Sequence, residues 1–148
     1  MADIVSPAVR SRMMSGIKSK NTKPEIILRK QLHGMGFRYR LHDRRLPGTP
    51  DMVFPRYHAV IFIHGCFWHG HECHIFKWPS SNTEFWKSKI NANKERDNGN
   101  KQKLLDAGWR IAIVWECAVR KSGYTGQSVA RKLADWLSGE SAWLEVTN

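Results

Sequence analysis

The stretch VIFIHGCFWHGHECH, from Val60 to His74, decides the fold of this chain. It begins with an apolar run typical of a strand buried on both faces, and then places two cysteines and four histidines within eleven positions. A second apolar run, Trp109–Glu116, predicts another central strand and ends just before Cys117. Asp51 stands beside a third apolar segment. Acidic nuclease sites are usually assembled at paired strand ends, so this arrangement indicates an enzyme.

The remaining elements follow from periodicity and from turn residues. Thr22 and Glu25 have the spacing of a capping box at the start of a helix that should end near Gly34 and Gly36. Four further elements are predicted: an exposed strand at 37–41, a strand hairpin at 51–64, a long helix from 82 or 83 to 105 that Gly99 could interrupt, and an amphipathic helix at 127–137. This order predicts an α/β sandwich with a mixed central sheet and helices on both faces.

Length and charge limit the function. A chain of 148 residues with 41% hydrophobic content suits one compact domain, which we place at residues 21–148, preceded by a basic arm at residues 1–20. The net charge is +11, and residues 1–45 hold eleven Lys or Arg against three acidic residues. This imbalance indicates a polyanionic partner, most plausibly nucleic acid, although a basic surface can also serve solubility alone.

The cysteines indicate a metal site. Three cysteines cannot form a closed set of disulfides, whereas three thiolates and one imidazole complete a tetrahedral zinc shell. Sequence spacing leaves open which histidine joins them, since four lie within reach: His64, His69, His71 and His74. The longest aliphatic or aromatic run has five residues, too short for a membrane span, and no signal-peptide pattern opens the chain, so we expect a cytoplasmic protein.

Four ordered motifs carry a resemblance to a known family. They are LPGTPD ending at Asp51, VIFIHGCFWHGHECH, TEFWKSKINAN with ERD ending at Asp97, and GWRIAIVWEC ending at Cys117. Together they resemble the very-short-patch repair (Vsr) endonucleases. The resemblance implies a restriction-endonuclease-like three-layer sandwich with a structural zinc site. It also implies a Mg²⁺-dependent enzyme that nicks duplex DNA 5′ of the thymine in a T:G mismatch left by deamination of 5-methylcytosine.

The resemblance assigns catalytic roles. Asp51 would bind Mg²⁺ together with the backbone carbonyl of Ile63, a position where family members often have threonine. His69 would act as the base and Asp97 would orient it, because a carboxylate fixes the tautomer of an imidazole. His64 would contact the scissile phosphate. Glu25 would assist metal-bound water, although helix capping alone is an alternative explanation of its spacing from Thr22.

The resemblance also assigns the metal-binding histidine and the residues that contact DNA. His71 would complete the zinc shell with Cys66, Cys73 and Cys117. Phe67 and Trp68, on the loop between zinc ligands, would form a wedge inserted at the mismatch, joined by Trp86. Met14 would insert from the opposite groove, although a methionine near a terminus is as often used in packing.

Two other functions remain open at this stage. A restriction-type or structure-selective endonuclease would cut paired or branched DNA, and a zinc-stabilised DNA-binding module would have no activity. For the repair function, the resemblance implies a bacterial, nucleoid-associated monomer. It would work with mismatch-repair proteins and a repair polymerase and be functionally linked to a cytosine-5 DNA methyltransferase.

Overall fold

The computed structural model describes residues 21–147 except 75, 122 and 124. The predicted basic arm at residues 1–20, including Met14, therefore lies outside the described residues. The elements occur in the order α2 (Lys23–Gly34), β1 (Arg40–Leu41), β2 (Met52–Phe54), the 3-10 turn η1 (Pro55–Tyr57), β3 (Ala59–His64), α3 (Thr83–Asp106), β4 (Arg110–Trp115), α4 (Glu116–Lys121), α5 (Gln127–Ser138) and β5 (Trp143–Val146).

The sheet is mixed, as predicted. Its five strands lie in the order β1-β2-β3-β4-β5, with β1, β2 and β3 antiparallel and β3, β4 and β5 parallel. The predicted hairpin is confirmed, since Met52 pairs with Ile61 and Phe54 pairs with Ala59. The parallel pairing of β3 with β4 runs from Ala59 opposite Arg110 to His64 opposite Trp115. Both apolar strands therefore end at the same edge of the sheet.

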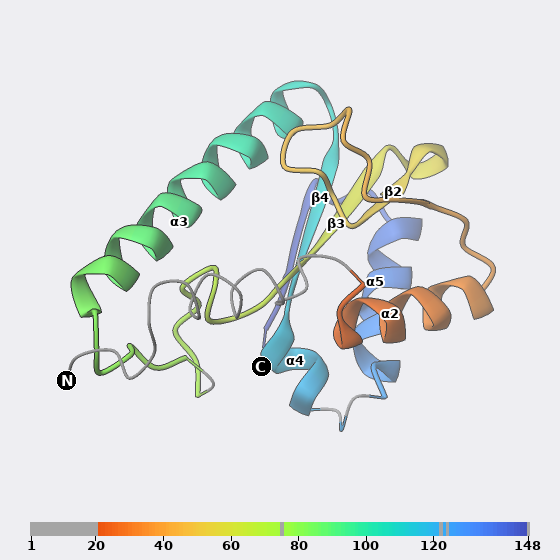
Figure 1. Cartoon of the computed structure of the whole chain (residues 1–148). Helices are drawn as coiled ribbons and strands as arrows, with labels where there is room; N and C mark the ends of the chain where they lie inside the picture. Colours follow the sequence, from red (N-terminus) through yellow and green to blue (C-terminus); the bar gives the residue numbers. More distant parts are fainter. Residues whose placement is uncertain (1–20, 75, 122, 124, 148) are drawn as a thin grey trace.

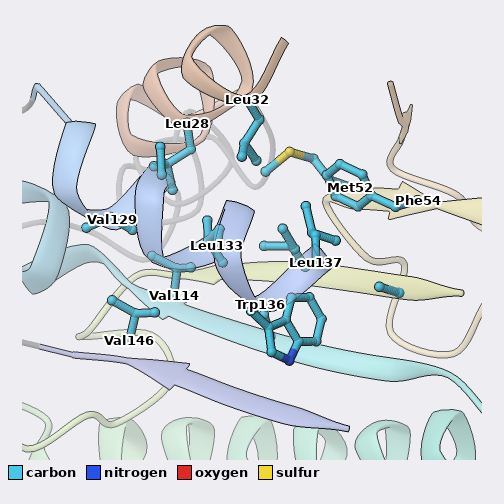
Figure 2. Close-up of a cluster of buried hydrophobic side chains, with 14 of the residues drawn as sticks. Leu28, Leu32, Met52, Phe54, Val114, Val129, Leu133, Trp136, Leu137 and Val146 are labelled. Atoms are coloured by element: carbon cyan, nitrogen blue, oxygen red, sulfur yellow. The ribbon is translucent and has the colours of Figure 1, made fainter. Parts of the chain in front are cut away.

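Helices cover both faces of the sheet (Figure 1). On one face, α2 and α5 pack on the sheet through a core that includes Leu28, Leu133 and Ile61, and Figure 2 shows part of this cluster. On the other face, Leu104 of α3 packs with Phe62 and Ile113. The predicted inward residues of α5 are all buried: Val129, Leu133, Trp136 and Leu137.

The capping box predicted at the start of α2 is wrong. The helix begins where expected, but Thr22 makes no side-chain capping hydrogen bond. Glu25 Oε1 instead accepts a hydrogen bond from the backbone N–H of Asn21 at 3.1 Å. The Glu25 side chain is 1% exposed and its other oxygen is directed at His42, so the carboxylate serves a buried cluster and not only a helix end.

Three other details differ from the sequence prediction. The exposed strand is short, with Arg40 and Leu41 alone in β1, because Phe37 and Tyr39 pack against the α2 side of the core. Helix α3 runs through Gly99 without interruption. The strand β5 was not predicted. Although α3 has 24 residues, no helix in the described part of the chain is long and apolar enough to cross a membrane.

Candidate active site

A cleft of about 350 Å³ opens between the end of the central strands and helix α3. Asp51 reaches it from the start of β2, Ile63 and His64 from the end of β3, and His69 from the loop that follows. Its lining residues are Gly48, Thr49, Asp51, Phe62, Ile63, His64, His69, Arg96, Asp97, Asn100 and Lys101. The cleft thus brings together two carboxylates, two imidazoles and three basic or amide side chains of α3.

Asp51 is held by the neighbouring strand. Its Oδ2 accepts a hydrogen bond from the backbone N–H of Ile63 at 2.7 Å, a contact that follows from the antiparallel pairing of β2 and β3. Burial raises the pKa of Asp51 to about 8; the Ile63 hydrogen bond opposes this rise and the nearby Glu25 carboxylate adds to it. Two carboxylates are therefore placed close together without enough local positive charge to compensate both.

His42 completes this acidic cluster. Its Nε2–H donates to Glu25 Oε2 at 2.7 Å and lies 4.0 Å from Asp51 Oδ1. Arg29 also contacts Glu25, at 3.2 Å. One ligand atom each from Glu25, His42 and Asp51 lie within 4.8 Å of one another, close enough to share a metal ion. Paired carboxylate oxygens are the donors that a hard divalent cation prefers, so the cluster fits such an ion.

Sequence reasoning missed His42, although a signal was available. The residue follows β1 directly, and β1 pairs with β2 so that Leu41 lies opposite Met52. The backbone N–H of His42 donates to the carbonyl of Asp51 at 3.2 Å. If the predicted strand at 37–41 had been paired with the predicted hairpin at 51–64, His42 would have been expected next to Asp51.

His69 and Asp97 form an imidazole–carboxylate pair, as the resemblance implied. Their Nδ1 and Oδ2 atoms lie 2.5 Å apart. Burial acts to raise the pKa of Asp97, but the hydrogen bond and charge of His69 prevail and lower it. Asp97 is therefore ionised near neutral pH and accepts the Nδ1–H of His69, which leaves Nε2 as the ring nitrogen able to take a proton.

His64 stacks on His69, with ring centroids 3.8 Å apart and planes 5° from parallel. Burial, reinforced by the neighbouring His69, lowers the pKa of His64 to about 3. His64 is therefore neutral at physiological pH and can offer one N–H donor and one lone pair but no positive charge. Its Nδ1 is buried and has no hydrogen-bond partner among the described residues.

A second cluster lies at the same edge of the sheet. One ligand atom each from Cys66, His71, Cys73 and Cys117 lie within 4.8 Å of one another. His71 Nδ1 is 3.6 Å from Cys117 Sγ, and the Cys117 backbone N–H donates to Cys66 Sγ at 3.4 Å. Burial raises the pKa of the Cys66 thiol, with further contributions from the neighbouring sulfurs. Among the four histidines left open by the sequence, His71 is the one grouped with all three cysteines.

The loop between Cys66 and Cys73 carries Phe67 and Trp68, which form an aromatic cluster with Trp86 of α3. Phe67, Trp68 and Trp86 pack edge to face, with ring centroids 5.2 to 5.7 Å apart. Asn93 Nδ2 donates to the Trp68 carbonyl at 2.9 Å, which attaches the loop to α3. All three rings are half-buried. Such a cluster offers ring faces on which bases can stack.

Comparison with known proteins gives a consistent result. The sequence model of the family described as DNA mismatch endonuclease Vsr matches residues 2–75. The chain is 44% identical over 147 residues to the DNA mismatch endonuclease Vsr of Escherichia coli K12, covering 99% of this chain and 94% of that protein. It is also 48% identical over 123 residues to the type II nicking enzyme V.XorIIP of Xanthomonas oryzae pv. oryzae, covering 83% of this chain and 90% of that protein.

Proposed function

The chain belongs to the Vsr family of DNA mismatch endonucleases, and we propose that it nicks duplex DNA 5′ of the thymine in a T:G mismatch. Its general activity is that of a DNA mismatch endonuclease. The observation that carries the finer proposal is the shared cleft, which places Asp51 opposite the His69–Asp97 pair. We also propose that the mixed sandwich is of the restriction-endonuclease-like type.

The proposed mechanism assigns one step to each group in the cleft. His69 removes a proton from the attacking water through Nε2, since its Nδ1–H is held by Asp97. The stack of His64 on His69 limits rotation of the base, and the neutral His64 ring donates one N–H toward a phosphate oxygen. Lys101, which lines the same cleft, adds positive charge near the DNA backbone.

We propose that Asp51 holds Mg²⁺ together with the backbone carbonyl of Ile63, and that the neighbouring Glu25 assists metal-bound water. The raised pKa of Asp51 supports this role, because burial and, to a smaller extent, the Glu25 carboxylate disfavour the charge of Asp51, and a divalent cation would compensate that charge. When bound there, Mg²⁺ would neutralise the charge that develops on the phosphodiester. Any contribution from a threonine hydroxyl at position 63 is absent in this chain, which has isoleucine.

We propose that the ion held by Cys66, His71, Cys73 and Cys117 is Zn²⁺ and that its role is structural. Three sulfurs and one imidazole nitrogen suit tetrahedral zinc, and a shell closed by four protein ligands leaves no position for substrate.

The aromatic cluster supports recognition of a mismatch. Inserting Phe67 and Trp68 between base steps costs a few kcal/mol of unstacking, which is smallest at a mispaired step. Trp68→Ala should therefore reduce the preference for mismatched over paired duplex while leaving the metal sites intact. Met35→Ala provides a control for loss of an exposed apolar side chain, because Met35 is 42% exposed and lies at the end of α2, away from the aromatic cluster.

The test of the proposed function is strand-specific cleavage of end-labelled duplexes with one T:G mismatch in varied sequence contexts. We expect a nick 5′ of the mismatched thymine that requires Mg²⁺ and is lost in Asp51→Ala. Duplexes with T:A and C:G pairs serve as controls. Equal cutting of paired or branched DNA would favour a restriction-type or structure-selective endonuclease. Tight binding without any cleavage would favour a DNA-binding module.

We further propose that the enzyme acts as a monomer on DNA in the bacterial cytoplasm. Its nick would be extended by a repair polymerase, with assistance from mismatch-repair proteins. The enzyme would be functionally linked to a cytosine-5 DNA methyltransferase, because deamination of the 5-methylcytosine that such an enzyme makes yields thymine opposite guanine.

A further inference from the structure

The C-terminal strand β5 directs two polar side chains toward the active-site face of the sheet. β5 pairs in parallel with β4, and Glu145 lies opposite Ile113, which packs on the α3 side. Because side chains alternate along a strand, Glu145 and Thr147 face this side, whereas Leu144 and Val146 pack in the opposite core. The register of β5 thus determines which side chains reach the metal cluster and the catalytic histidines.

Glu145 holds the ring of Trp115. The Trp115 Nε1–H donates to Glu145 Oε2 at 2.6 Å, and the Trp115 side chain is buried. One face of this ring stacks on His71, with centroids 4.2 Å apart and planes 8° from parallel. The same ring meets His64 edge to face, at 5.2 Å and 73°. Trp115 is therefore in contact with both a proposed metal ligand and the histidine on which the proposed base stacks.

Thr147, the residue that follows β5, contacts the His71 ring at Nε2. Its hydroxyl oxygen lies 3.0 Å from His71 Nε2 and 3.7 Å from Cys117 Sγ. With His71 Nδ1 facing the cysteines as the proposed ligand atom, the ring proton is on Nε2, so the Thr147 hydroxyl accepts the Nε2–H and its own proton can be donated to the cysteine sulfur. This contact stabilises the proton on Nε2 and leaves the Nδ1 lone pair directed at the cluster, where Nδ1 is 3.6 Å from Cys117 Sγ.

We propose that β5 is a positioning element of the active centre, in which Thr147 fixes the tautomer and orientation of His71 and Glu145 fixes Trp115 between His71 and His64. Neither residue contacts the reacting atoms. The expected effect of Thr147 on metal retention is inferred from the geometry of the Cys66, His71, Cys73 and Cys117 cluster alone. The effect on catalysis rests on the proposed function, because it acts through the placement of His64 and His69.

The first test compares metal release from three forms of the full chain: unsubstituted, Thr147→Val and Thr147→Ser. Each is loaded with Zn²⁺ and mixed with a chromogenic chelator. Loss of a hydrogen bond to a metal-bound histidine typically weakens metal binding by about 10–100-fold, so the valine variant should release zinc correspondingly faster. The serine variant keeps the hydroxyl and should resemble the unsubstituted protein. Equal release from valine and unsubstituted proteins would overturn the role of Thr147.

The second test separates positioning from folding. Glu145→Leu removes the acceptor of Trp115 Nε1, Glu145→Gln keeps a carbonyl oxygen there, and Glu140→Leu controls for loss of an exposed carboxylate elsewhere. Glu145→Leu leaves the Trp115 Nε1–H without its acceptor, so it should lower Tm by a few degrees, and at temperatures where it stays folded it should lower the single-turnover nicking rate by about 10-fold or more at unchanged DNA affinity. Glu145→Gln should restore most of the rate.

The outcomes of the two tests can be told apart. If folded Glu145→Leu nicks at the unsubstituted rate, or if glutamine restores Tm without restoring the rate, the positioning role of Glu145 is wrong. If no variant and no unsubstituted protein nicks mismatched DNA, the proposed function fails. Zinc release from Thr147→Val and Glu145→Leu still decides whether β5 holds the cluster, because that measurement needs no DNA.

Discussion

Asp51→Asn should stabilise the metal-free protein while abolishing its activity. Asp51 is largely buried beside Glu25, and its strand hydrogen bond to Ile63 does not offset the cost of the charge, so its pKa is raised to about 8. Asparagine keeps the size of the side chain and an oxygen that can accept the Ile63 N–H. It removes the buried charge that opposes folding when no cation is bound.

The size and pH dependence follow from linkage. A carboxyl whose pKa rises from 3.8 to about 8 on folding binds its proton more tightly in the folded state. Its contribution to stability is therefore most favourable below pH 3.8 and is lost as pH rises to about 8. At about 1.36 kcal/mol per pKa unit the upper limit is near 6 kcal/mol, and local relaxation and the shared titration with Glu25 reduce the expected gain to roughly 1–3 kcal/mol.

Thermal unfolding in chelator at pH 8 and pH 5 tests this reasoning. Each kcal/mol gained raises Tm by roughly 2–4 °C in a chain of this size, and the gain should be smaller at pH 5. Mg²⁺ should raise the Tm of the unsubstituted protein and not of Asp51→Asn. Asp43→Asn is the control, because Arg45 lowers the pKa of Asp43 to about 2 and removing that carboxylate should bring no gain. An asparagine variant no more stable at pH 8 would refute the argument.

Three further predictions concern single side chains. Asp97→Asn should lower the single-turnover nicking rate by about 10²–10⁴-fold without weakening DNA binding, because asparagine can stabilise the wrong tautomer of His69; unchanged rates would contradict the assigned base. His42→Ala should weaken the rise of Tm with Mg²⁺ by freeing Glu25, whereas His42→Gln should retain it; equal responses would exclude a positioning role. Gly70→Ala should cost about 1–3 kcal/mol in chemical denaturation, because Gly70 has φ +64° and a Cβ would lie 2.7 Å from Ile90 Cγ2; an unchanged midpoint would show that the loop can shift.

The sequence was sufficient for the parts of the fold that depend on strong local patterns. Continuous apolar runs predicted β3 and β4, and the turn at Pro55 predicted the hairpin that places Asp51 beside Ile63. The Cys and His spacing indicated one metal cluster, and the structure groups Cys66, Cys73 and Cys117 with His71. These features were predictable because each depends on residue type and spacing within one segment or on two strands that pair directly.

The parts that were missed depend on contacts between distant segments. The strand β5 contains only four residues and alternates exposed and buried positions, so its own pattern is too short to indicate a strand. The spacing of Thr22 and Glu25 fits a capping box, but burial beside His42 directs the carboxylate elsewhere. Local propensity cannot show whether Glu25 caps the helix or contacts His42, because the free energy that decides between the two comes from residues that are remote in sequence.

The segment Cys66–Cys73 shows why a metal cluster stands beside this cleft. It carries the proposed base His69 and the aromatic pair Phe67 and Trp68, and it lies outside any helix or strand. Ordering its eight residues costs roughly 8–16 kcal/mol of backbone entropy. Its own backbone hydrogen bonds, such as His71 N–H to the Cys66 carbonyl, contribute only about 1 kcal/mol each. Zinc binding at a structural site supplies about 10–16 kcal/mol, enough to offset that entropy, so with the proposed Zn²⁺ bound, the placement of the proposed base His69 and of the aromatic pair would depend on the same ion.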